Sequence, residues 1–223
     1  MNNLQVTAHL ATALSVTDDW SPSLEALLEY LWLDDKGLAL PNPSAKNLLK
    51  AELPLRMDNL KGQDFWACSS PFYLKDAQQI DKYRKRWDYQ DKHLNWGKKK
   101  QKVNTSEGVT KCYDMPLKLI NTPRLDWFLV GDRNKVEKLL STCTAIGKKR
   151  SYGKGQVYRW EVKEVEHDWS LTRNDRLTRA IPIDLIHDKL DLTGYNFLRW
   201  GWKNPSWLPE SIALCVMPFT QIC

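Results

Sequence analysis

Hydrophobic positions near the start of the chain predict a strand, a helix and a second strand. Apolar and polar residues alternate imperfectly over residues 4–13, which is typical of a strand. Apolar residues then recur at the spacing of one helix face, at Leu24, Leu27, Leu28 and Leu31. We expect Ser21 to cap this helix, Pro22 to occupy its first position, and the helix to end near residues 34–37. Residues 65–74 predict another strand, interrupted by a proline.

The second half of the chain repeats this order of elements. A short apolar strand is expected at residues 127–130, and Asp132 can cap a second helix. That helix has an apolar face formed by Val136, Leu139, Leu140 and Cys143. Gly147 occupies the place of a helix C-terminal glycine, and alternation resumes over residues 158–163. The sequence therefore predicts an α+β fold, with the βαββαβ order of a ferredoxin-like domain.

Two regions lie outside this plan. Residues 76–120 combine charged and aromatic residues with a strand-like segment at 103–120, and we expect them to form an inserted basic arm on a strand pair. The predicted divisions are 1–75 and 121–168 for the halves of the domain, 76–120 for the arm, and 169–223 for an extension packed on the same domain. The extension contains Trp200, Trp202 and Trp207, which suit a stacking platform but more often serve core or interface packing.

Composition narrows the class of protein. At 223 residues, with 42% hydrophobic and 27% charged residues, the chain has the profile of a soluble globular protein. Its start has no basic segment ahead of the apolar residues, and no apolar run approaches membrane-spanning length, so we expect a cytoplasmic protein with no membrane partner. The five cysteines and four histidines are scattered without metal-binding spacing, so we expect no metal and no cofactor.

Positive charge is concentrated in two short segments. Residues 81–102 carry nine basic and three acidic side chains, and residues 147–159 carry five basic and none acidic. The net charge of the whole chain is +6, so the remainder is slightly acidic. This concentration favours a nucleic-acid-binding surface over a role in solubility alone.

The second basic segment contains a glycine-rich loop between a predicted helix and a predicted strand. Glycine allows backbone N–H groups to approach a phosphate, lysine and arginine release counterions, and tyrosine can stack on an unpaired base. The residues of this glycine-rich loop, all expected to bind RNA, are Gly147, Lys148, Lys149, Arg150, Ser151, Tyr152, Gly153, Lys154 and Gly155. The spacing matches neither a phosphate-binding P-loop nor a dinucleotide-binding fingerprint, so nucleotide hydrolysis has little support.

The arm supplies a second group of candidate residues. Basic and aromatic side chains interleave at residues 83–89, and a basic tip without apolar anchors follows at 97–102. The arm residues expected to bind nucleic acid are Arg84, Arg86, Trp87, Lys98, Lys99, Lys100 and Lys102.

Several stretches together resemble a known family. They are TAHLAT, SPSLEALLEYLWL, FWACSSPFYL, VNTSEGVTKCYDMPLKL, DWFLVGDRNKVEKLL, IGKKRSYGKGQVYRWEV and WKNPSWLPESIALCVMP. In this order the chain resembles the RAMP superfamily of CRISPR-associated proteins, and more narrowly the handle-binding, Cas-five-type subunit of type IV CRISPR effector complexes.

The resemblance implies a non-catalytic role in a ribonucleoprotein. Such subunits grip the 5′ handle of the guide RNA (crRNA) and cap a filament of backbone, Cas-seven-type subunits. They also help to hold the large, Cas-eight-type subunit at the PAM-proximal end of the target DNA. Pairing with the guide then reads the target sequence, while the protein reads backbone and shape.

Two other functions remain open. Some RAMP relatives are metal-independent endoribonucleases that process CRISPR repeat RNA by acid–base chemistry, and His93, beside the basic arm, is the histidine placed near the predicted RNA surface. A structural scaffold that meets an acidic protein partner would also use the basic segments, but it would not require the glycines. We therefore expect a binding protein and not an enzyme.

Overall fold

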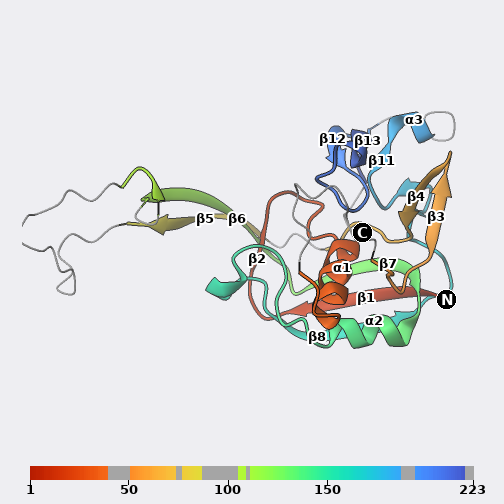
Figure 1. The fold of residues 1–223 in the computed structure, drawn as a ribbon, viewed down its shortest axis with the longest axis horizontal. Helices are drawn as coiled ribbons and strands as arrows, with labels where there is room; N and C mark the ends of the chain where they lie inside the picture. The colour runs from red at the N-terminus through yellow and green to blue at the C-terminus, as the bar shows by residue number, and fades with distance from the viewer. Residues whose placement is uncertain (40–50, 74–76, 87–104, 109–110, 187–193, 219–223) are drawn as a thin grey trace, which may run out of the picture.

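The computed structural model of the protein describes residues 1–39, 51–73, 77–86, 105–108, 111–186 and 194–218 (Figure 1). It is a mixed α/β structure with mainly antiparallel sheets and few helices. The predicted combination of helices and strands in one fold is therefore confirmed.

The central sheet has β1 (Asn2–Leu10) between two antiparallel neighbours. These are β7 (Arg124–Gly131) on one side and β8 (Val157–Glu164) on the other. Val6 pairs with Trp127 of β7 and Val162 of β8, and all three side chains are buried. The alternation read near the start of the chain thus reflects a strand with one face in the core.

Helices α1 (Leu24–Asp35) and α2 (Arg133–Leu140) contact each other and cover this core-facing side of the sheet (Figure 1). Leu24 and Leu28 of α1 and Val136 and Leu140 of α2 are fully buried in the same cluster as the apolar residues of β1. The helix-spacing pattern therefore identified the buried faces of both helices.

The start of α1 differs from expectation. Ser23, and not Ser21, caps the helix: its backbone is extended, and its hydroxyl accepts a hydrogen bond from the Ala26 N–H at 3.3 Å. The Ser21 hydroxyl instead donates to the carboxylate of Asp18, so Pro22 lies outside the helix. The predicted end of α1 and the cap of α2 by Asp132 are confirmed.

The strand expected at residues 65–74 is broken into shorter pieces. β3 (Met57–Leu60) and β4 (Gln63–Trp66) form a hairpin, and the chain then meets β7 only through single bridges at Cys68 and Phe72. Between these bridges, the N–H of Phe128 donates to the hydroxyl of Ser69. A side chain thus takes the place of a backbone carbonyl in the pairing with β7. This segment nevertheless follows the outer edge of β7.

The arm is built on the strands β5 (Ala77–Lys85) and β6 (Tyr113–Asn121), which pair along their whole length and project from the body (Figure 1). β2 (Leu14–Val16) extends the same sheet on the other side of β6 and ties the root of the arm to the body. The four-part division of the chain stays a prediction.

The C-terminal part forms a second small core. It contains β9 (Thr172–Arg173), β10 (Arg176–Leu177), β11 (Ile181–Pro182), α3 (Ile183–Ile186), β12 (Phe197–Gly201), a 3-10 turn (Pro209–Ser211) and β13 (Ile212–Val216). Trp202 is buried here against Phe65, with ring centroids 5.7 Å apart, whereas Trp207 is 45% exposed. Packing is thus the role of Trp202. Over the described residues, no helix is long and apolar enough to cross a membrane.

Candidate nucleic-acid interface

The glycine-rich loop connects α2 to β8, and a short 3-10 turn, Arg150–Tyr152, forms its tip. α2 ends at Leu140 with Ser141 as its C-cap, seven residues before Gly147. The prediction that Gly147 ends the helix is therefore wrong, because the helical pattern that reached Cys143 does not continue in the backbone.

Two glycines of the loop are required by contacts within the fold. A Cβ on Gly147 would lie 2.6 Å from the Ser15 carbonyl oxygen, and one on Gly155 would lie 2.0 Å from that of Ile146. The N–H of Lys148 donates to Ser15 and that of Gly155 to Ala13. These two N–H groups are thus used within the fold and are not available to a phosphate, while RNA binding by the loop residues stays a prediction. Around Gly153, in contrast, the space is open.

A cluster of three tyrosines joins the tip of the loop to the arm. The hydroxyl of Tyr83, on β5, lies 2.7 Å from that of Tyr152 and 3.0 Å from that of Tyr113, on β6. Lys149 adds a cation–π contact, with Nζ 3.5 Å from the centre of the Tyr83 ring. The hydrogen bond with Tyr83 raises the pKa of Tyr152 above its ordinary value. Loop and arm therefore form one surface, on which 60% of Tyr152 stays exposed.

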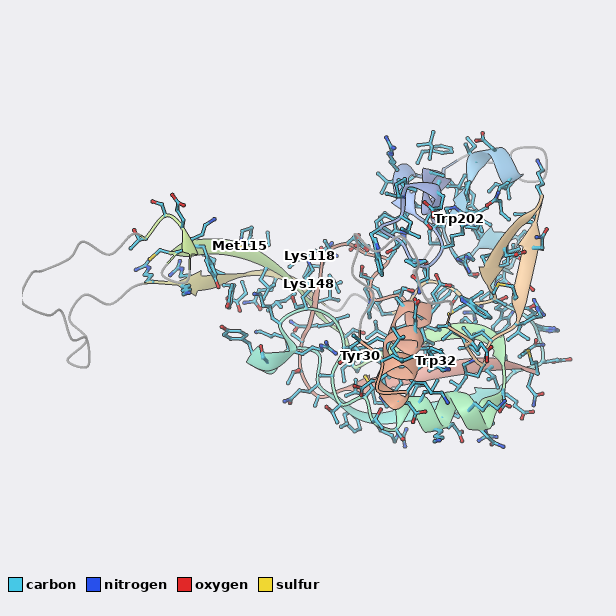
Figure 2. The ribbon with its side chains drawn as sticks, in the orientation of Figure 1. Tyr30, Trp32, Met115, Lys118, Lys148 and Trp202 are labelled. Atoms are coloured by element: carbon cyan, nitrogen blue, oxygen red, sulfur yellow. The ribbon has the colours of Figure 1, made fainter. Side chains whose placement is uncertain are left out.

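The predicted basic residues occupy different places on this surface. Lys148, Arg150 and Ser151 are exposed, while Lys154 lies 3.4 Å from the carboxylate of Asp81, in the middle of β5. Figure 2 shows Lys148 where the arm leaves the body, in agreement with its backbone bond to β2.

Two of the predicted arm residues lie at the end of β5, where they alternate with Tyr83 and so point to the opposite face of the arm from the loop. Arg84 is ion-paired with Asp114 at 3.1 Å, and Arg86 is exposed. Trp87, Lys98, Lys99, Lys100, Lys102 and His93 lie outside the described residues.

Sequence reasoning missed the contribution of α1 and of further arm residues. Lys82 is exposed, and Lys118 lies 2.6 Å from Asp19. The guanidinium carbon of Arg150 lies 5.6 Å from the centre of the Tyr30 ring, on α1. The sequence shows basic residues at every second position, Lys82, Arg84 and Arg86, and this spacing could have identified Lys82. The contact of Tyr30 with Arg150, 120 positions away, could not be predicted from the sequence.

A cavity of about 310 Å³ lies between the first turns of α1 and the loop. Lys148, Arg150, Ser23 and Tyr30 are among the residues that line it. A helix N-terminus and two cations face one space here, which favours an anionic group such as phosphate.

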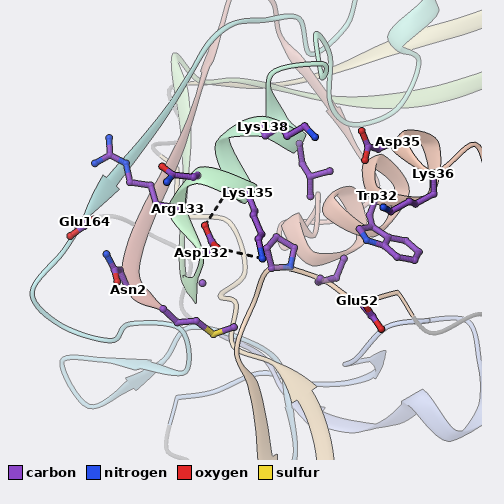
Figure 3. Close-up of a pocket in the computed structure, with 16 residues that line it drawn as sticks. Asn2, Trp32, Asp35, Lys36, Glu52, Asp132, Arg133, Lys135, Lys138 and Glu164 are labelled. Atoms are coloured by element: carbon purple, nitrogen blue, oxygen red, sulfur yellow. Dashed lines mark hydrogen bonds and ion pairs between the residues drawn. The ribbon is translucent and has the colours of Figure 1, made fainter.

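A larger cavity, of about 790 Å³, lies between the end of α1 and the start of α2 (Figure 3). Its lining alternates cations and acids, and Asp132 pairs there with Lys135 at 3.7 Å. It shares no lining residue with the glycine-rich loop. Acidic and basic side chains are mixed there, so this cavity does not have the character of a phosphate-binding surface.

Comparison with known proteins places the chain in a family. No curated protein matches the sequence. The model of the family described as "CRISPR type IV associated protein Csf3" matches residues 70–218, a span that includes both arm strands, the glycine-rich loop and the C-terminal core. The match covers more than half of the 223 residues and confirms the predicted association with type IV CRISPR systems. The chain therefore belongs to the Csf3 family of type IV CRISPR-associated proteins.

Proposed function

We propose that this chain is a non-catalytic subunit of a type IV CRISPR ribonucleoprotein that grips the 5′ handle of the guide RNA. In this proposal it is a RAMP-superfamily protein of the Cas-five type. It caps the filament of backbone subunits, meets the large subunit, and helps to engage the PAM-proximal end of target DNA.

The strand order supports the fold assignment. From edge to edge the central sheet runs through the segment bridged at Cys68 and Phe72, then β7, β1 and β8. With α1 and α2 on one face, this is the antiparallel order that a βαββαβ chain produces in a ferredoxin-like domain. Along the chain, the arm lies between the segment bridged at Cys68 and Phe72 and strand β7. This position agrees with a thumb-like insertion between the halves of the domain.

The observation that carries the proposal is the attachment of the glycine-rich loop to the arm. Through Tyr83, Tyr113 and Tyr152, two basic segments that are far apart in sequence are joined. The basic residues of the loop are Lys148, Lys149, Arg150 and Lys154, and those of the arm are Lys82, Arg84 and Arg86, on the face opposite Tyr83. On β5 and β6, the acidic residues are Asp81 and Asp114, each paired with one of these cations.

This chemistry suits a single strand held by its backbone. Cations separated by a few residues track successive phosphates, and exposed tyrosine offers a stacking surface for an unpaired base. Because such contacts read no sequence by themselves, target recognition remains with guide pairing.

The groups around the loop support binding without cleavage. A ribonuclease needs a group that removes the 2′-hydroxyl proton near neutral pH. Here the titratable side chains of the loop are lysine, arginine and tyrosine, and the pKa of Tyr152 is raised further by Tyr83. The alternative function, a metal-independent endoribonuclease using His93, predicts instead that the protein cleaves repeat RNA.

The direct experiment is purification of the complex from its host, followed by sequencing of the RNA that accompanies it. We expect guide RNAs that share one repeat-derived 5′ sequence, protected from added nuclease by this subunit. Absence of RNA, or RNAs with random 5′ ends, would refute handle binding.

A further inference from the structure

The arm has two faces of different chemistry. Side chains alternate between the two faces of a strand, and residues directly opposite each other on β5 and β6 share a face. One face contains Tyr83 and Tyr113 and meets the tip of the glycine-rich loop through Tyr152. The residues of the opposite face, called the outer face from here on, are Ile80, Lys82, Arg84, Arg86, Asp114, Pro116 and Lys118.

The outer face is open where the arm leaves the body. Over the described residues, β2 pairs with β6 only at residues 118–120, so the arm beyond this point is a ribbon of two strands (Figure 1). Lys82, Arg84 and Arg86 are exposed on this ribbon, whereas the two residues between them are half-buried. The loop therefore lies against one face of the ribbon and leaves the outer face accessible to a partner.

Positive charge dominates the outer face of the ribbon. Asp114 is the acidic residue of this face among those described, and it pairs with Arg84 at 3.1 Å. Within the described part of the chain, no acidic side chain pairs with Lys82 or Arg86. An exposed ion pair such as that of Arg84 contributes little to stability, so Arg84 can also turn to an anionic partner.

The three cations form a row along the strand. Residues two apart on one face of a strand are separated by about 6.4–6.8 Å, because each residue adds about 3.2–3.4 Å. Neighbouring phosphates along one nucleic-acid strand have a similar separation. Lys82, Arg84 and Arg86 can therefore follow successive phosphates of one backbone.

The division of aromatic residues between the two faces indicates which kind of nucleic acid each face suits. Single strands are bound by cations together with aromatic rings on which unpaired bases stack. A double helix keeps its bases stacked inside and presents phosphates, which cations alone can bind. Among the described residues, Tyr83, Tyr113 and Tyr152 lie on the loop side, and no residue of the outer face is aromatic. The outer face therefore has the composition of a duplex-binding surface.

We propose that the outer face of the arm binds the phosphate backbone of a double helix, while the opposite face and the glycine-rich loop hold single-stranded RNA. The arm then lies between two nucleic acids and keeps them apart. The target DNA duplex and the heteroduplex of guide and target share this phosphate chemistry. The inference rests on the proposed function only in taking the single strand on the loop side to be guide RNA.

Charge-neutral variants test the outer face without shortening its side chains severely. The outer-face variant, Lys82→Gln with Arg86→Gln, removes two exposed cations that have no ion pair among the described residues. The matched control, Lys36→Gln with Lys138→Gln, removes two exposed cations near the ends of α1 and α2. Tyr152→Ala alters the loop side, where the ring is exposed.

The first measurement is the affinity of the full chain for a short labelled DNA duplex and for an RNA–DNA heteroduplex, at a series of salt concentrations. We expect wild type and control to bind at least one of them, and the tighter probe identifies the source. In the outer-face variant, the slope of log affinity against log salt should fall by up to about 0.9 for each lost phosphate contact. This variant should lose more affinity for duplex than for handle RNA, and Tyr152→Ala should show the reverse. Wild type that binds no duplex, or equal losses in variant and control, would overturn the proposal.

The second measurement is competition between the two nucleic acids. With handle RNA bound at saturation, the labelled duplex should still bind, because the two occupy opposite faces of the arm. If handle RNA displaces the duplex, both use one face and the proposal fails, even though each binds alone. If handle RNA does not bind wild type while duplex binding still depends on Lys82 and Arg86, the proposed function fails and the duplex site stands.

Discussion

The two glycines Gly153 and Gly155 should respond differently to the same substitution. Both have positive φ, +73° and +65°, so alanine at either position carries a backbone strain of about 1–2 kcal/mol. At Gly153 no other atom lies within 4 Å of the added Cβ, and strain is the whole cost. At Gly155 the Cβ would lie 2.0 Å from the backbone oxygen of Ile146, so the backbone must move.

That movement breaks hydrogen bonds that close the base of the loop. Gly155 donates to Ala13 and accepts from Ile146, both at 2.9 Å, and each bond contributes about 1 kcal/mol. Gly155→Ala should therefore lower the free energy of unfolding by about 3–4 kcal/mol, and Gly153→Ala by about 1–2 kcal/mol. Urea unfolding followed by circular dichroism, with unchanged slopes, measures the difference. Equal losses in the two variants would refute the reasoning that internal packing, and not nucleic acid, requires Gly155.

Three further outcomes are expected. Arg179→Met should lower the free energy of unfolding by about 3–5 kcal/mol, because it leaves the Glu25 carboxylate buried without its cation; the exposed Arg199→Met should cost almost nothing in the same urea titration. Burial raises the pKa of Glu25 above 4.5, with Arg179 only partly opposing it. The stability contributed by the protonated form is therefore complete below about pH 4.5 and lost as pH rises through the raised pKa. Glu25→Gln should remove that decline, and parallel stability curves for variant and wild type over this range would contradict it. Purified protein should bind end-labelled repeat RNA and leave it intact for hours, with or without magnesium; site-specific cleavage abolished by His93→Ala would establish the nuclease instead.

Local patterns predicted the secondary structure well wherever a short segment decides it. The Asp132 cap depends on an N–H three residues away, and the buried face of α1 follows from the spacing of its leucines. Which of Ser21 and Ser23 caps α1 was harder to predict from the sequence. It depends on the carboxylate of Asp18, which engages the competing hydroxyl.

The candidate site was predictable in composition but not in geometry. Charge counting identified the loop and the arm as basic, yet it could not show that Tyr83 and Tyr152 join them across 69 positions. It also could not show that packing requires Gly147, because the Ser15 carbonyl that excludes a side chain there belongs to a distant strand. The Glu25–Arg179 pair was invisible for the same reason, since its partners lie 154 residues apart.

The central claim is that the glycine-rich loop binds the backbone of guide RNA. The most direct test is the affinity of the full chain for handle RNA at a series of salt concentrations. It compares wild type with the combined alanine variant of Lys148, Lys149, Arg150 and Lys154. The matched control removes four cations elsewhere on the surface, at Lys36, Lys135, Lys138 and Lys163.

We predict that the loop variant binds more weakly and that its slope of log affinity against log salt falls by up to about 0.7 for each lost phosphate contact. The control variant should keep a slope close to that of wild type. An unchanged slope and affinity in the loop variant would contradict the account and leave the loop as a surface turn.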